Sequence, residues 1–250
     1  MVSQRLWPAF RPWSMGTLPN KRLKLTARVD YGMNLSSARR SLTARSVRPP
    51  PTNMRPLPFV WPYWPLFWAV CIWAFSPEFR LVRKAQKPAT HSDSPDAGSV
   101  RVIVLGGAIA MGIAFPLAWV PSLRVPSALD PAVFVIGVAA IVAGSVLRRH
   151  CWRLLGASFT GDVRAHPDQP IVTTGAYALV RHPSYSAGIL MNTGMGLALG
   201  SWASTAVLAL ASCAVYSYRI GVEERTLLAV VGEPYRKFMR TRRRLIPFIY

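Results

Sequence analysis

The chain has 250 residues and a formal net charge of +20; 51% of its residues are hydrophobic and only 16% are charged. Because soluble domains carry roughly a quarter charged residues, this composition indicates a membrane protein. The basic excess does not indicate nucleic-acid binding, since it lies in residues 1–55 and at the ends of apolar segments, where the cytoplasmic loops of membrane proteins carry it.

Residues 1–55 contain Arg, Ser, Pro and Asn without a sustained apolar stripe, which predicts a disordered basic extension. Met33 and Met54 are later positions at which translation could start. The sequence therefore leaves open whether this extension is native. Residues 56–250 are predicted to form one membrane domain.

Three apolar segments come next along the chain. Residues 57–76 carry no charge and four Trp, and the prolines up to Pro65 delay any helix to about that position. The sequence leaves open whether this segment crosses the bilayer or lies at its interface. Residues 102–120 and 131–147 are uncharged runs of 19 and 17 residues, close to the roughly 20 needed to cross hydrocarbon about 30 Å thick.

The longest uncharged run, residues 183–218, has 36 residues, too many for one span and enough for two. Gly200 and Ser201 offer a turn between them, which predicts a helical hairpin of residues 184–199 and 202–218. The predicted fold class is therefore all-α, a polytopic transmembrane helical bundle of about five spans.

The distribution of basic residues predicts the orientation of this bundle. A hairpin returns to the face from which it left, so the basic segments 148–182 and 219–250 share one face. Lys and Arg mark cytoplasmic loops, which predicts that this face, together with the loop 77–101, is cytoplasmic. If residues 57–76 span, the basic extension lies on the opposite side against the same rule. Either the extension is not native, which we favour, or residues 57–76 do not cross.

Two polar clusters, residues 175–185 and 219–224, flank the hairpin, and its folding brings them together. Arg219 and Glu223 are four residues apart and share a helix face. Ionisable groups at the membrane boundary are costly and usually mark a site. The same residues also fit a structural role, with Arg181 reaching the interface from a helix end and Glu223 paired to Arg219 on a solvated face.

Other kinds of site have little support in the sequence. It contains no HExxH, CxxC or paired-histidine spacing, so no metal is predicted. The three cysteines fit no redox or metal spacing and are interpreted as packing residues. A glycine-rich phosphate loop and a GxSxG nucleophile motif do not occur either.

Five short motifs, in their order and spacing, resemble the isoprenylcysteine carboxyl methyltransferase family over about residues 148–250, and related phospholipid methyltransferases share part of the pattern. The motifs are Ile171-Val172-Thr173-Thr174-Gly175-Ala176-Tyr177, Arg181-His182-Pro183-Ser184-Tyr185, Arg219-x3-Glu223-Glu224, Gly232-Glu233-x-Tyr235 and Arg244-Leu245-Ile246-Pro247-Phe248.

The resemblance implies S-adenosylmethionine as the cofactor, in a cytosolic pocket formed by the loop before and the tail after the last hairpin. Arg219 would hold the carboxylate of the acceptor, assisted by Arg181. Gln169 and Pro170 depart from the histidine-containing form of the eukaryotic enzymes. The cofactor-binding residues implied by position are Gln169, Pro170, Ile171, Val172, Tyr177, His182, Pro183, Ser184, Tyr185 and Glu223.

The reaction implied is carboxyl O-methylation of an isoprenylcysteine-like molecule, with membrane lipid and a lipophilic or prenylated acceptor as partners. Methyl transfer from a sulfonium needs little acid–base help, so holding both reactants in register supplies much of the acceleration. Phospholipid or other small-molecule N-, O- or S-methylation is the nearest alternative. A non-catalytic membrane scaffold or transport component is an alternative of another class. The sequence does not predict the oligomeric state.

Overall fold

The structure, a computed structural model, describes residues 55–85, 98–156 and 170–246. The chain divides into two units, Met1–Pro49 and Pro50–Tyr250, and every described residue belongs to the second. Apart from Arg55, the basic extension predicted for residues 1–55 lies outside the described residues, and its disorder stays a prediction.

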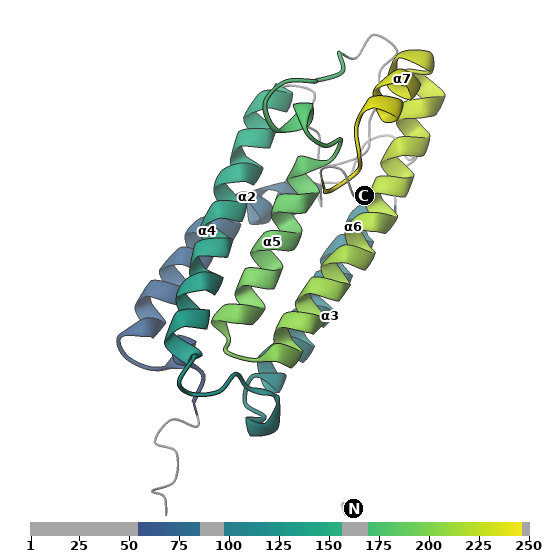
Figure 1. Ribbon diagram of the computed structural model, residues 1–250. Helices are drawn as coiled ribbons and strands as arrows, with labels where there is room; N and C mark the ends of the chain where they lie inside the picture. The colour runs from purple at the N-terminus through teal and green to yellow at the C-terminus, as the bar shows by residue number, and fades with distance from the viewer. Residues whose placement is uncertain (1–54, 86–97, 157–169, 247–250) are drawn as a thin grey trace, which may run out of the picture. The chain divides into compact units, whose positions relative to one another are not determined.

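Helices make up most of the described part of the chain. They are α2 (Tyr63–Ala85), α3 (Ser99–Leu117), α4 (Asp130–Leu155), α5 (Pro183–Ala198), α6 (Trp202–Val230) and α7 (Glu233–Thr241), with 3-10 turns η1 (Leu57–Phe59), η2 (Pro121–Leu123) and η4 (Gly175–Ala178). The residues that the structure describes form no strand, so the all-α prediction is confirmed. In Figure 1, α2 to α6 lie side by side in alternating direction, and α7 lies at the end where α6 finishes.

All five predicted apolar segments are helical. Three of the helices, α3, α4 and α6, are long and apolar enough to cross a membrane, which supports an integral membrane protein. Helix α5 has 16 residues, and α2 has 23 residues with Pro77 inside it. Crossing by these two helices, and hence the total of about five spans, stays a prediction.

Two helices run beyond the ends predicted from the uncharged runs. Helix α4 continues past Arg148 to Leu155, and α6 continues past Arg219 to Val230. Charged residues end a hydrocarbon span but not a helix, because Arg, Glu and Leu are good helix formers. The true stops are glycines with positive φ, Gly156 at +52° and Gly232 at +72°, a conformation that favours glycine at helix ends.

Helix α5 packs closely against its two neighbours through glycines. A Cβ added to Gly194 would lie 2.7 Å from the Gly137 carbonyl oxygen of α4, and one added to Gly196 would lie 2.7 Å from the Thr205 nitrogen of α6. These backbones are therefore nearly in contact, as expected for small residues between membrane helices. Figure 1 shows α5 between α4 and α6.

The predicted turn of the hairpin is confirmed, and it lies at the end of the bundle away from α7. Gly200 has a φ of +68°, and the Ser201 side chain caps α6 by accepting from the Ser204 nitrogen. The turn also pairs with the loop before α4, because Val125 N donates to the Gly200 carbonyl at 2.9 Å and Ser201 Oγ donates to the Leu123 carbonyl at 3.1 Å. The hairpin is thereby fixed at its closed end, and both of its free ends point toward α7.

Candidate functional site

At the free end of the hairpin, the turn before α5 pairs with the chain after α7. Arg181 N donates to the Arg243 carbonyl at 2.8 Å, and His182 N donates to the Arg244 carbonyl at 2.9 Å. Pro183 then begins α5 at its first position, where its missing N–H costs nothing. Two segments about 60 residues apart in sequence therefore form one surface, as the folding of the hairpin predicts.

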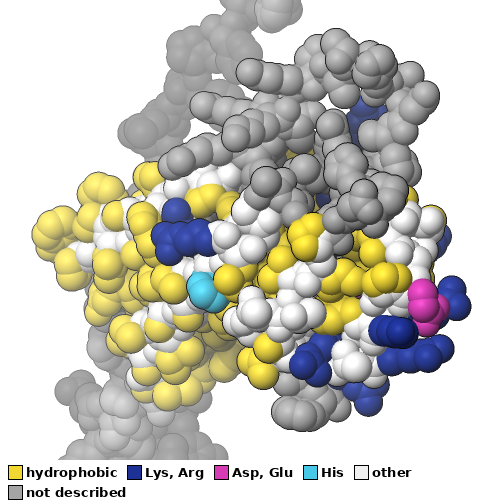
Figure 2. All heavy atoms as spheres, turned by 90° about the horizontal axis from the view of Figure 1, so that it is seen from above, with side chains coloured by type: hydrophobic (Ala, Val, Ile, Leu, Met, Phe, Trp, Pro, Cys, Tyr) yellow, Lys and Arg dark blue, Asp and Glu magenta, His cyan; other side chains and the backbone are white. Residues whose placement is uncertain are grey.

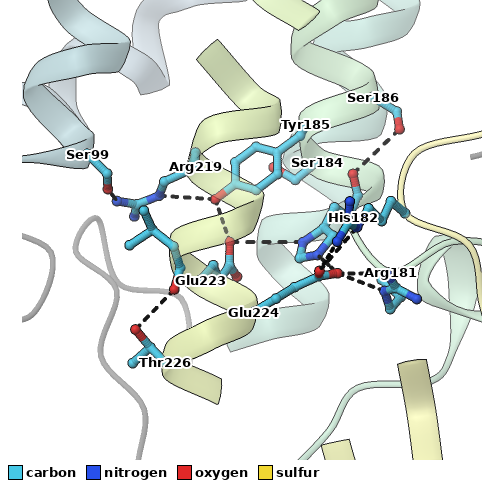
Figure 3. A network of polar contacts seen from close by, with 12 residues as sticks. Ser99, Arg181, His182, Ser184, Tyr185, Ser186, Arg219, Glu223, Glu224 and Thr226 are labelled. Carbon is cyan, nitrogen blue, oxygen red and sulfur yellow. Dashed lines mark hydrogen bonds and ion pairs between the residues drawn. The ribbon is translucent and has the colours of Figure 1, made fainter. Parts of the chain in front are cut away.

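Glu224 of α6 is buried beneath this turn and is shared by three cationic or ionisable side chains. Its side chain is only 4% exposed. It accepts from Arg181 Nε at 3.0 Å and from Arg244 Nε at 3.1 Å, and His182 Nε2 lies 3.2 Å from its Oε1. Glu224 thus joins α6 to the turn and to the tail, and its negative charge offsets part of the positive charge gathered there (Figure 3).

Arg181 is engaged within the protein on both sides of its guanidinium group. Besides Glu224, it donates from Nη1 to the Met239 carbonyl at 2.8 Å and to the Arg242 carbonyl at 2.6 Å. Its side chain is 9% exposed. This arrangement suits a residue that holds the tail in place, whereas the assistance to an acceptor predicted for Arg181 would need some of these bonds to be exchanged.

The neighbouring acid, Glu223, faces a different group. Tyr185 Oη donates to Glu223 Oε2 at 2.7 Å, and Arg219 Nε donates to Tyr185 Oη at 3.3 Å. His182 Nδ1 lies 3.9 Å from the same Glu223 oxygen. Arg219 also donates to Ser99 Oγ at the start of α3. The tyrosine hydroxyl therefore bridges the arginine and the glutamate, so the two predicted clusters do meet (Figure 3).

The remaining predicted cofactor residues lie around this network. Pro183 and Ser184 are buried in the first turn of α5. Tyr177 of η4 is buried too, and burial, with a smaller effect of the Glu223 charge, raises the pKa of its phenol, so that the hydroxyl stays protonated at neutral pH. The segment 170–172 is irregular and only partly covered, and its role stays a prediction. Gln169 lies outside the described residues.

Three residues in contact with this site were not predicted to belong to it. Glu78, Arg148 and Tyr216 come from α2, α4 and α6 and interact with one another beside α5. A signal existed for Arg148, because an arginine directly after an uncharged run must either reach the interface or find a buried partner. Nothing in the sequence pairs it with Glu78, which is 70 residues away.

The comparisons with known proteins agree with the predicted resemblance. The model of the isoprenylcysteine carboxyl methyltransferase family matches residues 135–229. Two similar relatives are the protein-S-isoprenylcysteine O-methyltransferase of Schizosaccharomyces pombe, 32% identical over 133 residues that cover 51% of this chain and 56% of the relative, and that of Xenopus laevis, 26% identical over 199 residues that cover 75% of this chain and 66% of the relative.

A solved structure, described as the eukaryotic intramembrane Ras methyltransferase ICMT, is 27% identical with a TM-score of 0.49, and the match covers 57% of this chain and 52% of that one. The chain thus spans a little over half the length of the first curated relatives it matches, 56% and 61% of them. Residues 135–229 carry the sequence pattern of the isoprenylcysteine carboxyl methyltransferase family, and the resemblance read from the motifs is confirmed.

Proposed function

We propose that this chain is a membrane methyltransferase that uses S-adenosylmethionine and acts on a lipophilic carboxylic acid of the isoprenylcysteine type. One observation carries the proposal: His182, Tyr185, Arg219 and Glu223 form one connected polar network, and they do so inside the segment that matches a methyltransferase family. The names of the relatives supply the reaction class.

The exposure of the two glutamates supports Glu223 as the cofactor contact. The Glu223 side chain is 29% exposed, whereas that of Glu224 is 4% exposed and faces three internal partners. Glu223 therefore has accepting capacity left for a ribose hydroxyl or an amino group, and the His182 and Tyr185 rings stand beside it. When bound, S-adenosylmethionine would supply a methyl group on a positively charged sulfur.

The depth of Arg219 suits an acceptor that arrives from the lipid. With Trp202 at one membrane interface, a rise of 1.5 Å per residue places Arg219 about 26 Å and Glu223 about 32 Å along α6, and hydrocarbon is about 30 Å thick. A carboxylate emerging from the acyl-chain region would meet the arginine first. The planar guanidinium offers paired donors that fit and orient a carboxylate.

The charge of the described surface supports a cytoplasmic site. Exposed basic side chains gather at the end that carries the site; they are Arg225, Arg236, Lys237, Arg240 and Arg243. Figure 2, which views this end from above, shows a group of Lys and Arg side chains in dark blue beside acidic atoms in magenta near one edge, further Lys and Arg elsewhere on this face, and hydrophobic side chains around the bundle. Basic residues at span ends mark the cytoplasmic face, where S-adenosylmethionine is made.

Equilibrium binding of radiolabelled S-adenosylmethionine to the detergent-solubilised protein tests the cofactor assignment. We expect the wild type to bind, and Glu223→Ala and His182→Ala to bind at least tenfold more weakly. Glu233→Ala is the matched control, because that glutamate is exposed on α7 and pairs with Arg236 of the same helix. A folded wild type without affinity for the cofactor would instead favour a scaffold or transport component.

A second assay separates carboxyl methylation from phospholipid amine methylation, the alternative that shares part of the sequence pattern. Membranes containing the protein are incubated with methyl-labelled cofactor and a prenylated cysteine acceptor, and the product is treated with base. A methyl ester releases volatile methanol, whereas a methylated amine keeps its label. Label that stays in the product after treatment with base would show that the acceptor is an amine and not a carboxylate.

A further inference from the structure

Behind the site, a buried arginine of α4 joins three helices. Arg148 is 8% exposed. Its Nη1 donates to the Ser184 carbonyl at the start of α5, at 2.6 Å. Its Nε and Nη2 both donate to the carboxylate of Glu78 on α2, the second at 3.0 Å. Paired, charge-assisted bonds of this kind fix both the position and the plane of a guanidinium group.

The plane of Arg148 matters because a run of stacked rings begins beside it. The guanidinium carbon lies 5.8 Å from the centre of the Tyr216 ring. Tyr216 stacks on Tyr185 with ring centres 5.1 Å apart and an angle of 24°, and Tyr185 stacks on His182 at 5.7 Å and 22°. We name His182, Tyr185 and Tyr216 the aromatic column. Its Tyr216 end lies beside Arg148, and its Tyr185 and His182 rings lie beside Glu223.

The aromatic column is built without spare room against α5. A Cβ added to Gly188 would lie 2.7 Å from Tyr216 Cζ and 2.9 Å from Arg148 Nη1. Tyr216 and Arg148 therefore both pack directly against the backbone of α5, where a side chain at position 188 would collide with them.

We propose that Arg148, oriented by Glu78, is a positioning residue for the methyltransferase site. It fixes the position of the Tyr216 ring, and Tyr216 in turn fixes the Tyr185 ring that stacks on it. The Tyr185 hydroxyl donates to Glu223 and accepts from Arg219. The inference rests on the proposed function. It extends the site to α2, because Glu78 lies outside the segment that matches the family, residues 135–229.

A matched pair of substitutions at adjacent residues tests this proposal. Arg148→Lys keeps the charge beside Glu78 but loses the planar group over Tyr216. Arg149→Lys is the same change one residue on. Arg149 also reaches α2, with its guanidinium carbon 4.7 Å from the Trp73 ring, and it donates to Ser145 Oγ at 3.3 Å; these partners are not part of the aromatic column.

Each variant is measured for its melting temperature and for its affinity for radiolabelled S-adenosylmethionine in detergent. Arg148→Lys should lose more thermal stability than Arg149→Lys, because Arg148 is buried and paired with Glu78 whereas Arg149 is half-buried. Only Arg148→Lys should bind the cofactor more weakly, by about tenfold, since cation–π and stacking contacts of this size are at stake. Glu78→Gln, which keeps one of the two acceptor oxygens and loses the charge, should fall between Arg148→Lys and the wild type.

Equal cofactor affinity in Arg148→Lys and the wild type would overturn the positioning role, and so would equal weakening in Arg148→Lys and Arg149→Lys, because the effect would then come from general loosening of α2. A folded wild type that binds no cofactor would be a different outcome: it removes the proposed function itself and the positioning claim with it.

Discussion

At the scale of single residues, two adjacent glutamates have separate roles. Glu224 is buried and joins the turn before α5 to the tail through Arg181, His182 and Arg244. Glu223 accepts from Tyr185 and keeps part of its surface exposed. Adjacent residues on a helix point about 100° apart, which is enough to direct the Glu224 carboxylate into the protein and the Glu223 carboxylate toward the position proposed for the cofactor.

The first prediction compares Glu224→Gln with Glu223→Gln. The Glu224 change removes the negative charge shared by buried cations, which should lower the free energy of unfolding by about 3 kcal/mol. The Glu223 change should leave stability nearly unchanged and weaken cofactor binding about tenfold, the effect of one charge-assisted hydrogen bond. Thermal melting and equilibrium binding measure the two effects. A loss of stability in Glu223→Gln and a loss of cofactor affinity in Glu224→Gln would show that the two roles are assigned the wrong way round.

The second prediction concerns Arg219. Arg219→Lys keeps a positive charge but loses the paired donors that fit a carboxylate. We expect kcat/KM for the acceptor to fall by at least about tenfold, and by more than the cofactor affinity falls, although Arg219 also donates to Tyr185. Steady-state kinetics with varied acceptor, set beside the binding assay, tests this. Equal loss of both quantities would argue against Arg219 as the acceptor contact.

At the scale of helices, the close approach of α4 and α5 holds the site above them. The third prediction is that Gly194→Ala lowers stability by about 2 kcal/mol, because its new Cβ would lie 2.9 Å from both the Ala140 side chain and the Ile141 nitrogen. Gly112→Ala in α3 is the control, since nothing lies within 4 Å of a Cβ there. Thermal melting in detergent compares the two variants. An equal change in melting temperature in both variants would show that the close contact between α4 and α5 does not contribute more to stability than an open position in α3.

The number of apolar helices and their sequence along the chain could largely be predicted, because uncharged runs of about 20 residues and the turn residues between them indicate segments buried in lipid. The turn at Gly200 and the meeting of the two clusters follow from the length of one run. The ends of α4 and α6 could not be predicted in this way. The first charged residue indicates where the hydrocarbon-spanning part ends, whereas a glycine with positive φ determines where the helix ends. The pairing of Arg148 with Glu78 could not be predicted from the sequence either, because it depends on how α2 packs against α4.

At the scale of the whole described bundle, the two ends have different chemistry. One end has the hairpin turn, the exposed Trp61, Trp119 and Trp202, and the partly buried ion pair Arg124–Asp130 at 2.7 Å. The other end has the site and the exposed basic residues. Tryptophans at interfaces and basic residues on the cytoplasmic side are the usual features of a membrane protein.

The fourth prediction concerns this orientation. A cysteine at Arg240 on α7 should react with a membrane-impermeant maleimide only after cells are permeabilised, whereas one at Ser127, exposed in the loop before α4, should react in intact cells. Cys213 is the native cysteine with an exposed side chain among the described residues, and Cys213→Ser provides the background. Labelling of Arg240→Cys in intact cells would place the site on the outer face.

The claim on which the account depends is that the folded hairpin makes one cofactor site from the turn before α5 and the later part of α6. Ultraviolet photolabelling of the purified protein with radiolabelled S-adenosylmethionine, followed by tryptic mapping, tests it most directly. We expect label in the peptides 182–219 and 220–225, both suppressed by excess S-adenosylhomocysteine. Suppressible label that is absent from both of these peptides, or no label in a folded protein, would contradict it.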